Sequence, residues 1–144
     1  MKRKLFQASA LVLCLTLLMS CGTSNNENKT KLVGNDRDEH GCIASAGYQW
    51  SELLHDCKRP FEKGIRLNAA NENQTYAAYL VFNSDSSKVE VFLPKGKKPN
   101  PILEYQKAIT GEVIWTGKNE DELSVRCIQD IWGIYVDNQL HFVK

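Results

Sequence analysis

The sequence carries almost no net charge, because its 18 lysine and arginine residues are balanced by 17 aspartate and glutamate residues. Nucleic-acid-binding domains are normally basic, with their cations clustered, so this balance argues against a nucleic-acid partner. The chain also lacks the Gly-x-Ser-x-Gly, His-Glu-x-x-His and glycine-rich phosphate-loop motifs of common hydrolytic and phosphoryl-transfer enzymes. We therefore expect a protein that is not an enzyme and that has no metal and no cofactor.

No apolar run reaches the roughly 20 residues that a membrane-spanning helix needs. The apolar run at residues 5–19 follows the cations at positions 2–4 and ends at Ser20 and Cys21. A positive start, a short apolar segment and small residues at its end make a secretory signal. We expect residues 1–20 to be a signal peptide that is removed from the mature protein.

The end of this segment, Leu18-Met19-Ser20-Cys21, resembles the lipobox of bacterial lipoproteins. The resemblance implies cleavage before Cys21, a diacylglycerol thioether on its thiol and acylation of the new amino terminus. Two or more acyl chains hold a protein stably at a membrane, so the membrane is an expected partner. The alternative is an ordinary signal peptide in which Cys21 is incidental.

The residues that follow Cys21 are mostly polar as far as position 39. Such a segment cannot bury enough apolar surface to order itself, so we expect residues 21–39 to form a lipidated flexible tether. Gly22, directly after the lipid-bearing cysteine, resembles lipoproteins that are released to the outer membrane of diderm bacteria. The expected location is therefore the cell envelope, at the outer membrane if the host has two membranes.

Three cysteines remain beyond the tether: Cys42, Cys57 and Cys127. An oxidising envelope permits one disulfide and leaves one thiol. Cys42 and Cys57 close the shortest loop, and a loop of that size contributes roughly 3 kcal/mol. We expect Cys127 to be a buried free thiol that packs as a small hydrophobe, although pairing with Cys57 stays open. His40 and His55 each precede one of the first two cysteines by two positions, so tetrahedral zinc is a weaker alternative.

The segments Gly41-Cys-Ile-Ala-Ser-Ala-Gly-Tyr-Gln-Trp50 and Cys57-Lys-Arg-Pro-Phe-Glu62 resemble a short cysteine-rich module of bacterial secreted proteins. The pattern of that module has a second cysteine where this chain has Ser51, and a last cysteine near Gly64. Losing both while keeping the other pair fits a two-disulfide module reduced to one. Residues 40–64 are then a structural unit stapled by Cys42 and Cys57.

Within this unit, the aromatic residues Tyr48, Trp50 and Phe61 admit two interpretations. They pack over the disulfide, because a short cysteine-rich unit needs aromatic bulk, or they line a ligand groove. We favour packing. Ser51 is a suitable helix cap, so a short helix is predicted over 51–56.

The remaining residues, 65–144, alternate short apolar runs with turn residues, which is typical of strands. Asp137-Asn138 suits a tight hairpin turn. We expect a mainly β fold, a small antiparallel meander, barrel or sandwich, with the disulfide-stapled unit at its N-terminal side. The predicted strands cover residues 76–82, 88–93, 102–105, 112–116, 122–128, 132–136 and 139–143.

Residues 81–94 and 110–123 look like the meander of membrane-bound inhibitors of c-type lysozyme, which are small β-barrels on lipoproteins. Thr110-Gly111 echoes their Ser-Gly-x-x-Tyr sequence, and the segment from Trp115 to Lys118 echoes their Trp-x-x-Lys-Gly-like turn. The tyrosine is absent here, and the lysine and glycine are in reversed order. The resemblance therefore implies a barrel more than an inhibitory activity.

The expected function is that of a lipid-anchored, non-enzymatic binding domain whose partner is a protein or a cell-wall ligand. The candidate binding surface consists of Trp132, Lys95, Lys97 and Lys98. One alternative is inhibition of c-type lysozyme. Another is an envelope enzyme that uses Cys127 as its nucleophile.

Overall fold

The computed structural model describes residues 36–96, 98–107, 112–118 and 123–144. All of them belong to a unit that spans Leu32–Lys144. The predicted signal peptide, Cys21, most of the tether, Lys97 and Thr110-Gly111 lie outside the described residues. In the ranges that are described, no helix combines the length and the apolar character needed to cross a bilayer.

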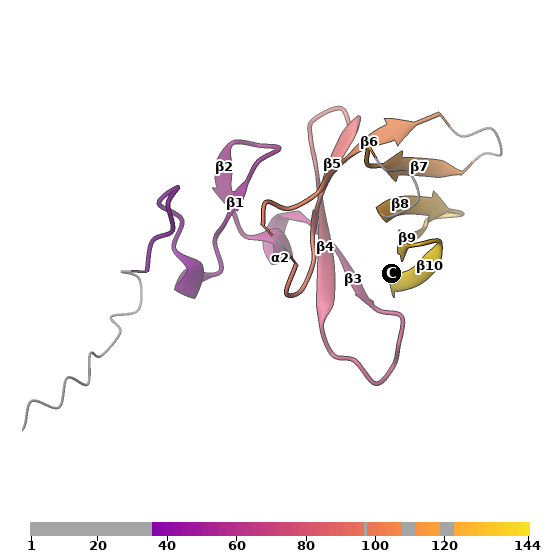
Figure 1. Cartoon of the computed structure of the whole chain (residues 1–144), viewed down its shortest axis with the longest axis horizontal. Coiled ribbons are helices and arrows are strands. Elements are labelled where there is room, and N and C mark those ends of the chain that lie inside the picture. Colours follow the sequence, from indigo (N-terminus) through magenta and orange to yellow (C-terminus); the bar gives the residue numbers. More distant parts are fainter. Residues whose placement is uncertain (1–35, 97, 108–111, 119–122) are drawn as a thin grey trace, which may run out of the picture. The chain divides into compact units, whose positions relative to one another are not determined.

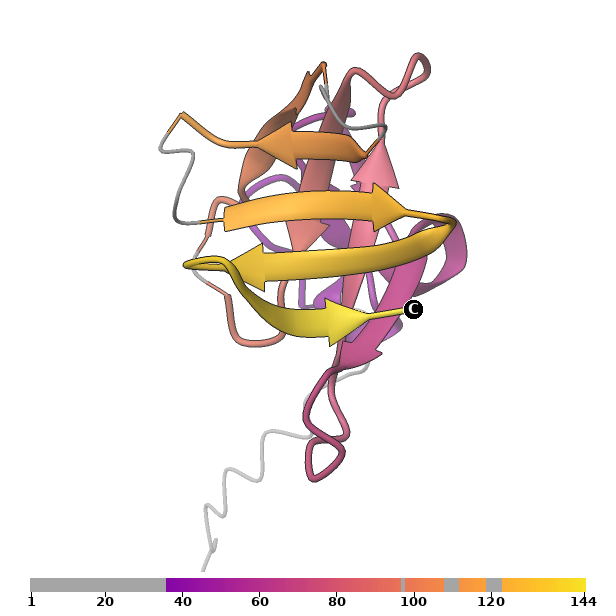
Figure 2. The same ribbon diagram turned by 90° about the vertical axis from the view of Figure 1, so that its right-hand side faces the viewer.

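Eight antiparallel strands close into a barrel (Figure 1). Each strand pairs with the next one along the chain, and β10 pairs with β3 to close the ring, so the predicted mainly β fold is confirmed and is a barrel. Figure 2 shows the side of the barrel formed by the last three strands. The strands are β3 (Ile65–Ala69), β4 (Ala77–Phe82), β5 (Lys88–Phe92), β6 (Ile102–Gln106), β7 (Val113–Thr116), β8 (Leu123–Ile128), β9 (Ile131–Val136) and β10 (Gln139–Val143).

Side chains from every strand fill the barrel interior. Alternate residues of a strand face opposite sides of its sheet, so each strand contributes only one of its two faces. Trp115 on β7 is the largest buried residue and forms an edge contact with Phe82 on β4. The buried core consists of Leu67, Ala78, Leu80, Val89, Val91, Leu103, Trp115, Val125, Ile134 and Phe142.

Two hairpins of the barrel turn through pairs of residues with left-handed backbone. Asp137 and Asn138, between β9 and β10, have φ values of 48° and 62°. A type I′ turn needs positive φ at both central positions, so this pair confirms the predicted hairpin turn. Gln129 and Asp130 do the same between β8 and β9, with φ values of 50° and 66°.

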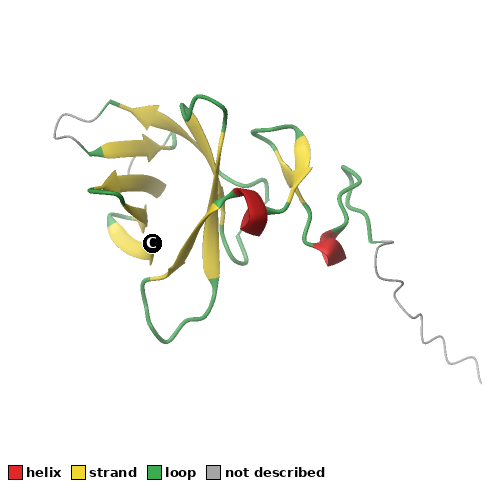
Figure 3. Ribbon diagram, turned by 180° about the vertical axis from the view of Figure 1, so that it is seen from behind, coloured by secondary structure: helices red, strands yellow, loops and turns green. Residues whose placement is uncertain are grey.

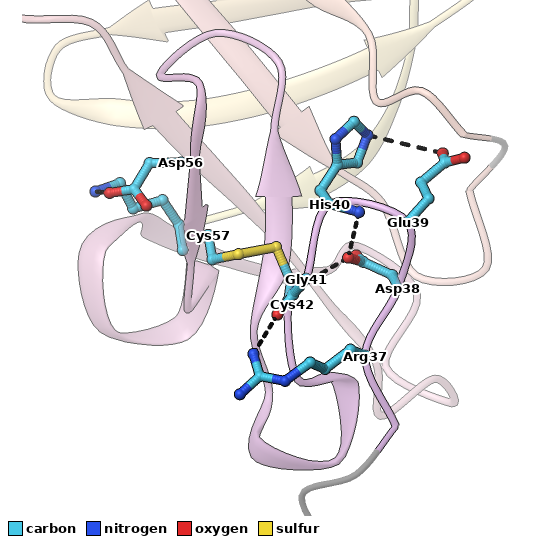
Figure 4. The surroundings of a disulfide bond; sticks show 9 residues. Arg37, Asp38, Glu39, His40, Gly41, Cys42, Asp56 and Cys57 are labelled. Atoms are coloured by element: carbon cyan, nitrogen blue, oxygen red, sulfur yellow. Dashed lines mark hydrogen bonds and ion pairs between the residues drawn. A yellow bond between two sulfur atoms is a disulfide. The ribbon is translucent and has the colours of Figure 1, made fainter.

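The N-terminal module, residues 40–64, holds four short elements: η1 (Ala44–Ala46), β1 (Gln49–Ser51), β2 (Asp56–Lys58) and α2 (Pro60–Lys63). In Figure 3, its two short helices are red and its strands are yellow. The predicted disulfide between Cys42 and Cys57 is present (Figure 4). It leaves no free thiolate at either position for the alternative zinc site.

The helix predicted over 51–56 is wrong. The Ser51 hydroxyl does accept a hydrogen bond from the Leu54 N–H, at 3.1 Å, as a helix cap would. The turn does not continue, because His55 has a φ of 50° and the chain reverses into β2. Trp50 on β1 then pairs with Cys57 on β2, so the segment is a hairpin joined to the disulfide.

Replacing both Cys42 and Cys57 by alanine tests the contribution of this staple. We expect the free energy of unfolding to fall by about 3 kcal/mol, because the unfolded chain regains the freedom that a loop of this size restricts. Urea unfolding of the full-length chain in detergent measures the loss. Cys127→Ala, which removes a thiol outside the disulfide, is the control. A double variant as stable as this control contradicts the expectation.

Candidate functional site

Glu90 on β5 is a fully buried carboxylate, with 0% of its surface exposed. The hydroxyl of Ser51 donates a hydrogen bond to it, and the Asn100 side-chain amide donates another at 3.0 Å. The backbone N–H groups of Glu52 and Leu53 also point to its oxygens, at 3.3 and 3.4 Å. A buried charge is tolerated only when hydrogen bonds replace water, and these groups supply them. Glu90 therefore joins the barrel wall to the module.

Lys98 extends the same network to the surface. Its ammonium donates to Gln49 Oε1 at 2.8 Å and to Asn100 Oδ1 at 2.9 Å. Removal from water lowers the pKa of Lys98, whereas the carboxylates of Glu90 and Asp38 act in the opposite direction. The loop between β5 and β6 is thus fastened to β1 of the module.

A groove of about 490 Å³ lies between the module and this loop. Its lining combines aromatic rings with charged and amide side chains. Trp50 stacks on His40, with ring centroids 4.3 Å apart and an interplanar angle of 9°. The Arg59 guanidinium lies 4.5 Å from the centre of the Tyr48 ring. The lining residues are Asp38, Glu39, His40, Ala44, Tyr48, Gln49, Trp50, Glu52, Lys98 and Pro99.

Two of the three aromatic residues considered for the module line the groove. Tyr48 and Trp50 pack against neighbours within the module, and they also line the groove. Phe61 is not part of the groove; it lies beside Gly47 and is 53% exposed. The indole N–H of Trp50 is buried and has no hydrogen-bond acceptor within the described ranges.

A second cavity has a volume of about 540 Å³. The loop between β5 and β6 forms part of its wall through Pro99 and Asn100. Its lining is largely apolar and includes the side chains of Leu93 and Leu123. Lys118, which follows β7, contributes the ammonium-bearing side chain of this wall. Small-molecule sites are commonly concave and mainly apolar with a few polar groups, so this barrel cavity is a secondary candidate.

One residue of the predicted binding surface, Lys98, lines the module groove. Lys95 is exposed in the same loop with a φ of 58°. Lys97 lies outside the described residues. Trp132 on β9 lines neither cavity, because it packs against the barrel core and stacks on Trp115 with centroids 5.6 Å apart.

Cys127 on β8 is a free, half-buried thiol that packs against the barrel core. Burial raises the pKa of Cys127, and the nearby charge of Asp130 acts in the same direction. A raised pKa lowers the thiolate fraction, which is the nucleophilic form. No group of histidine, cysteine, aspartate and glutamate side chains suited to a metal ion occurs in the part of the chain that the structure describes.

The central residue of the network, Glu90, is not among the residues predicted from the sequence. Alternation along β5 places Glu90 on the outer face of the barrel, where a glutamate normally faces water. The sequence does carry one signal, because Phe92 is a large apolar residue on the same outer face as Glu90. The structure shows Phe92 to be only 4% exposed, so another part of the chain covers this face.

Removing the buried carboxylate tests how strongly it holds the module. Glu90→Ala leaves the donors of Ser51 and Asn100 buried without an acceptor, so we expect the free energy of unfolding to fall by about 3 kcal/mol. The matched control is Glu104→Ala on the neighbouring strand, which removes an exposed ion pair with Lys88 and costs under about 1 kcal/mol. Urea unfolding compares them, and equal losses contradict the assigned role of Glu90.

Comparisons with protein families, curated proteins and solved structures found no match for this chain.

Proposed function

We propose that this chain is a lipid-anchored protein of the cell envelope whose non-enzymatic domain binds a protein or cell-wall ligand. The module groove is the binding site in this proposal. The observation that carries the binding role is the set of aromatic and charged side chains lining a groove of about 490 Å³. Binding sites of this kind combine apolar and aromatic walls with a few placed polar groups.

The anchoring part of the proposal rests on the N-terminal sequence. The cations at positions 2–4, the apolar residues 5–19 and Leu18-Met19-Ser20-Cys21 have the order of a lipoprotein signal. In the sequence, residues 22–35 lie between Cys21 and the described part of the chain, in which Arg37 already pairs with Ile43. Such a tether gives the groove access to ligands near the membrane surface, and in a diderm host that surface is the outer membrane.

The Cys42–Cys57 disulfide supports an extracytoplasmic location independently of the signal. Disulfides persist in oxidising compartments and are rare in the cytosol. The pair is present while Cys127 stays free and half-buried on β8. The raised pKa of Cys127 also makes it a poor nucleophile, so the enzymatic alternative has little support.

The anchor is tested by replacing a single sulfur. In the proposal, Cys21→Ser removes the thiol that forms the thioether, so the protein moves from the detergent phase to the aqueous phase in a detergent-partition assay. Cys127→Ser is the control and remains in the detergent phase. A Cys21→Ser protein that still partitions with the detergent contradicts the lipid anchor.

A second candidate function is inhibition of c-type lysozyme. The observation that favours it is the closed antiparallel barrel, which is the fold that the resemblance implies. In addition, Lys118, from the segment that echoes the inhibitors' turn, lines the barrel cavity.

This candidate predicts that the full-length protein in detergent slows c-type lysozyme at micromolar concentrations. Lys118→Ala should weaken the inhibition about ten-fold if the lysine makes a desolvated contact with the enzyme. Lys107→Ala changes an exposed lysine that does not line the cavity and serves as the control. Unchanged lysozyme activity at these concentrations contradicts the inhibitory function.

A further inference from the structure

The walls of the module groove carry more negative than positive charge. Asp38, Glu39 and Glu52 contribute carboxylates, whereas Lys98 contributes the one lysine or arginine side chain among the lining residues. The buried carboxylate of Glu90 accepts a hydrogen bond from the backbone N–H of the lining residue Glu52, and its charge opposes the lowering of the Lys98 pKa by removal from water. Because a concave site lined by one sign of charge focuses the field, the groove favours a positively charged group.

The carboxylates that line the groove differ in the hydrogen bonds and ion pairs that they form. Asp38 Oδ1 accepts hydrogen bonds from the backbone N–H groups of His40 and Cys42, at 3.0 and 2.8 Å. Glu39 Oε1 lies 3.7 Å from His40 Nε2. Figure 4 shows both carboxylates on the loop that precedes Cys42.

The side chain of Glu52 is different. It is half-buried, and its backbone N–H donates to Glu90, yet no hydrogen bond or ion pair is formed by its carboxylate with any described residue. A partly buried carboxylate without a partner is unfavourable by itself. Placed in the wall of a preformed groove, it is a ready counter-ion for a ligand.

Lys98, the one lysine among the lining residues, does not pair with Glu52. Neutral oxygens of Gln49 and Asn100 accept its hydrogen bonds, so the ammonium of Lys98 does not neutralise Glu52. The rings of Tyr48 and Trp50 line the groove and add apolar surface for a methylene chain. Charge and apolar surface thus favour the same type of ligand.

We infer that the module groove binds a primary ammonium group at the end of an aliphatic chain, with Glu52 as its counter-ion. This inference rests on the proposed function, in which the groove is the binding site. The ammonium donates to the Glu52 carboxylate, and the aliphatic chain lies against Tyr48 and Trp50. No covalent step is involved.

Three small probes test the inference on the full-length chain in detergent. They are Nα-acetyl-lysine amide, Nα-acetyl-norleucine amide, which lacks the terminal ammonium, and Nα-acetyl-glutamate amide. NMR titration follows the indole N–H of Trp50 and the backbone N–H of Glu52. We expect the lysine probe to shift both signals in a salt-sensitive manner and to bind at least about five-fold more tightly than the other two.

Glu52→Gln removes the charge with little change in shape and should weaken the lysine probe about five-fold or more. Glu72→Gln makes the same change in net charge at an exposed position in the loop between β3 and β4, and should leave binding unchanged. Equal weakening by the two variants overturns the role of Glu52.

The other outcomes separate this inference from the proposed function. Equal binding of the lysine and norleucine probes, or tighter binding of the glutamate probe, overturns the ammonium specificity while the groove remains a binding site. If no probe shifts the signals of the Trp50 indole N–H and the Glu52 backbone N–H, the inferred ammonium binding is also overturned. The anchoring result with Cys21→Ser is independent of all these measurements.

Discussion

A carboxylate that is wholly removed from water must be surrounded by hydrogen-bond donors, and this requirement on Glu90 organises the protein. The donors come from two separate parts of the chain. Ser51, Glu52 and Leu53 belong to the module or directly follow its first strand, whereas Asn100 belongs to the loop after β5. The barrel wall, the module and the loop are therefore held in one arrangement, because displacing either donor set leaves a buried charge uncompensated.

The groove is a consequence of that arrangement. One wall is the module and the other is the loop that carries Lys98 and Pro99, and Lys98 bridges them by donating to Gln49 and Asn100. A site whose walls are fixed in advance loses little conformational entropy when a ligand binds. The Cys42–Cys57 disulfide has a complementary role, because it holds the short module together while Glu90 holds the module to the barrel.

The sequence predicted a mainly β, antiparallel fold because strand alternation is a local signal, but it left open whether the strands form a meander, a barrel or a sandwich. The disulfide of the module was expected because an oxidising compartment permits one. Strand β3, Ile65–Ala69, was missed although its apolar residues alternate with polar ones and Leu67 is buried. The helix expected over 51–56 failed because pairing across the disulfide hairpin outweighed a local capping preference. Glu90 could not be identified by its own alternation, since the feature that buries it is a tertiary contact. The meeting of Lys98 with Gln49 likewise joins residues 49 positions apart.

Native-state hydrogen exchange tests most directly whether Glu90 makes the module and the barrel one cooperative unit. If Glu90 does so, the backbone N–H groups of the β1–β2 pair, Trp50 and Cys57, exchange with the same free energy of opening as that of Val91 in the core. Exchange of the module through a local opening of much lower free energy, while Val91 stays protected, would contradict this role of Glu90.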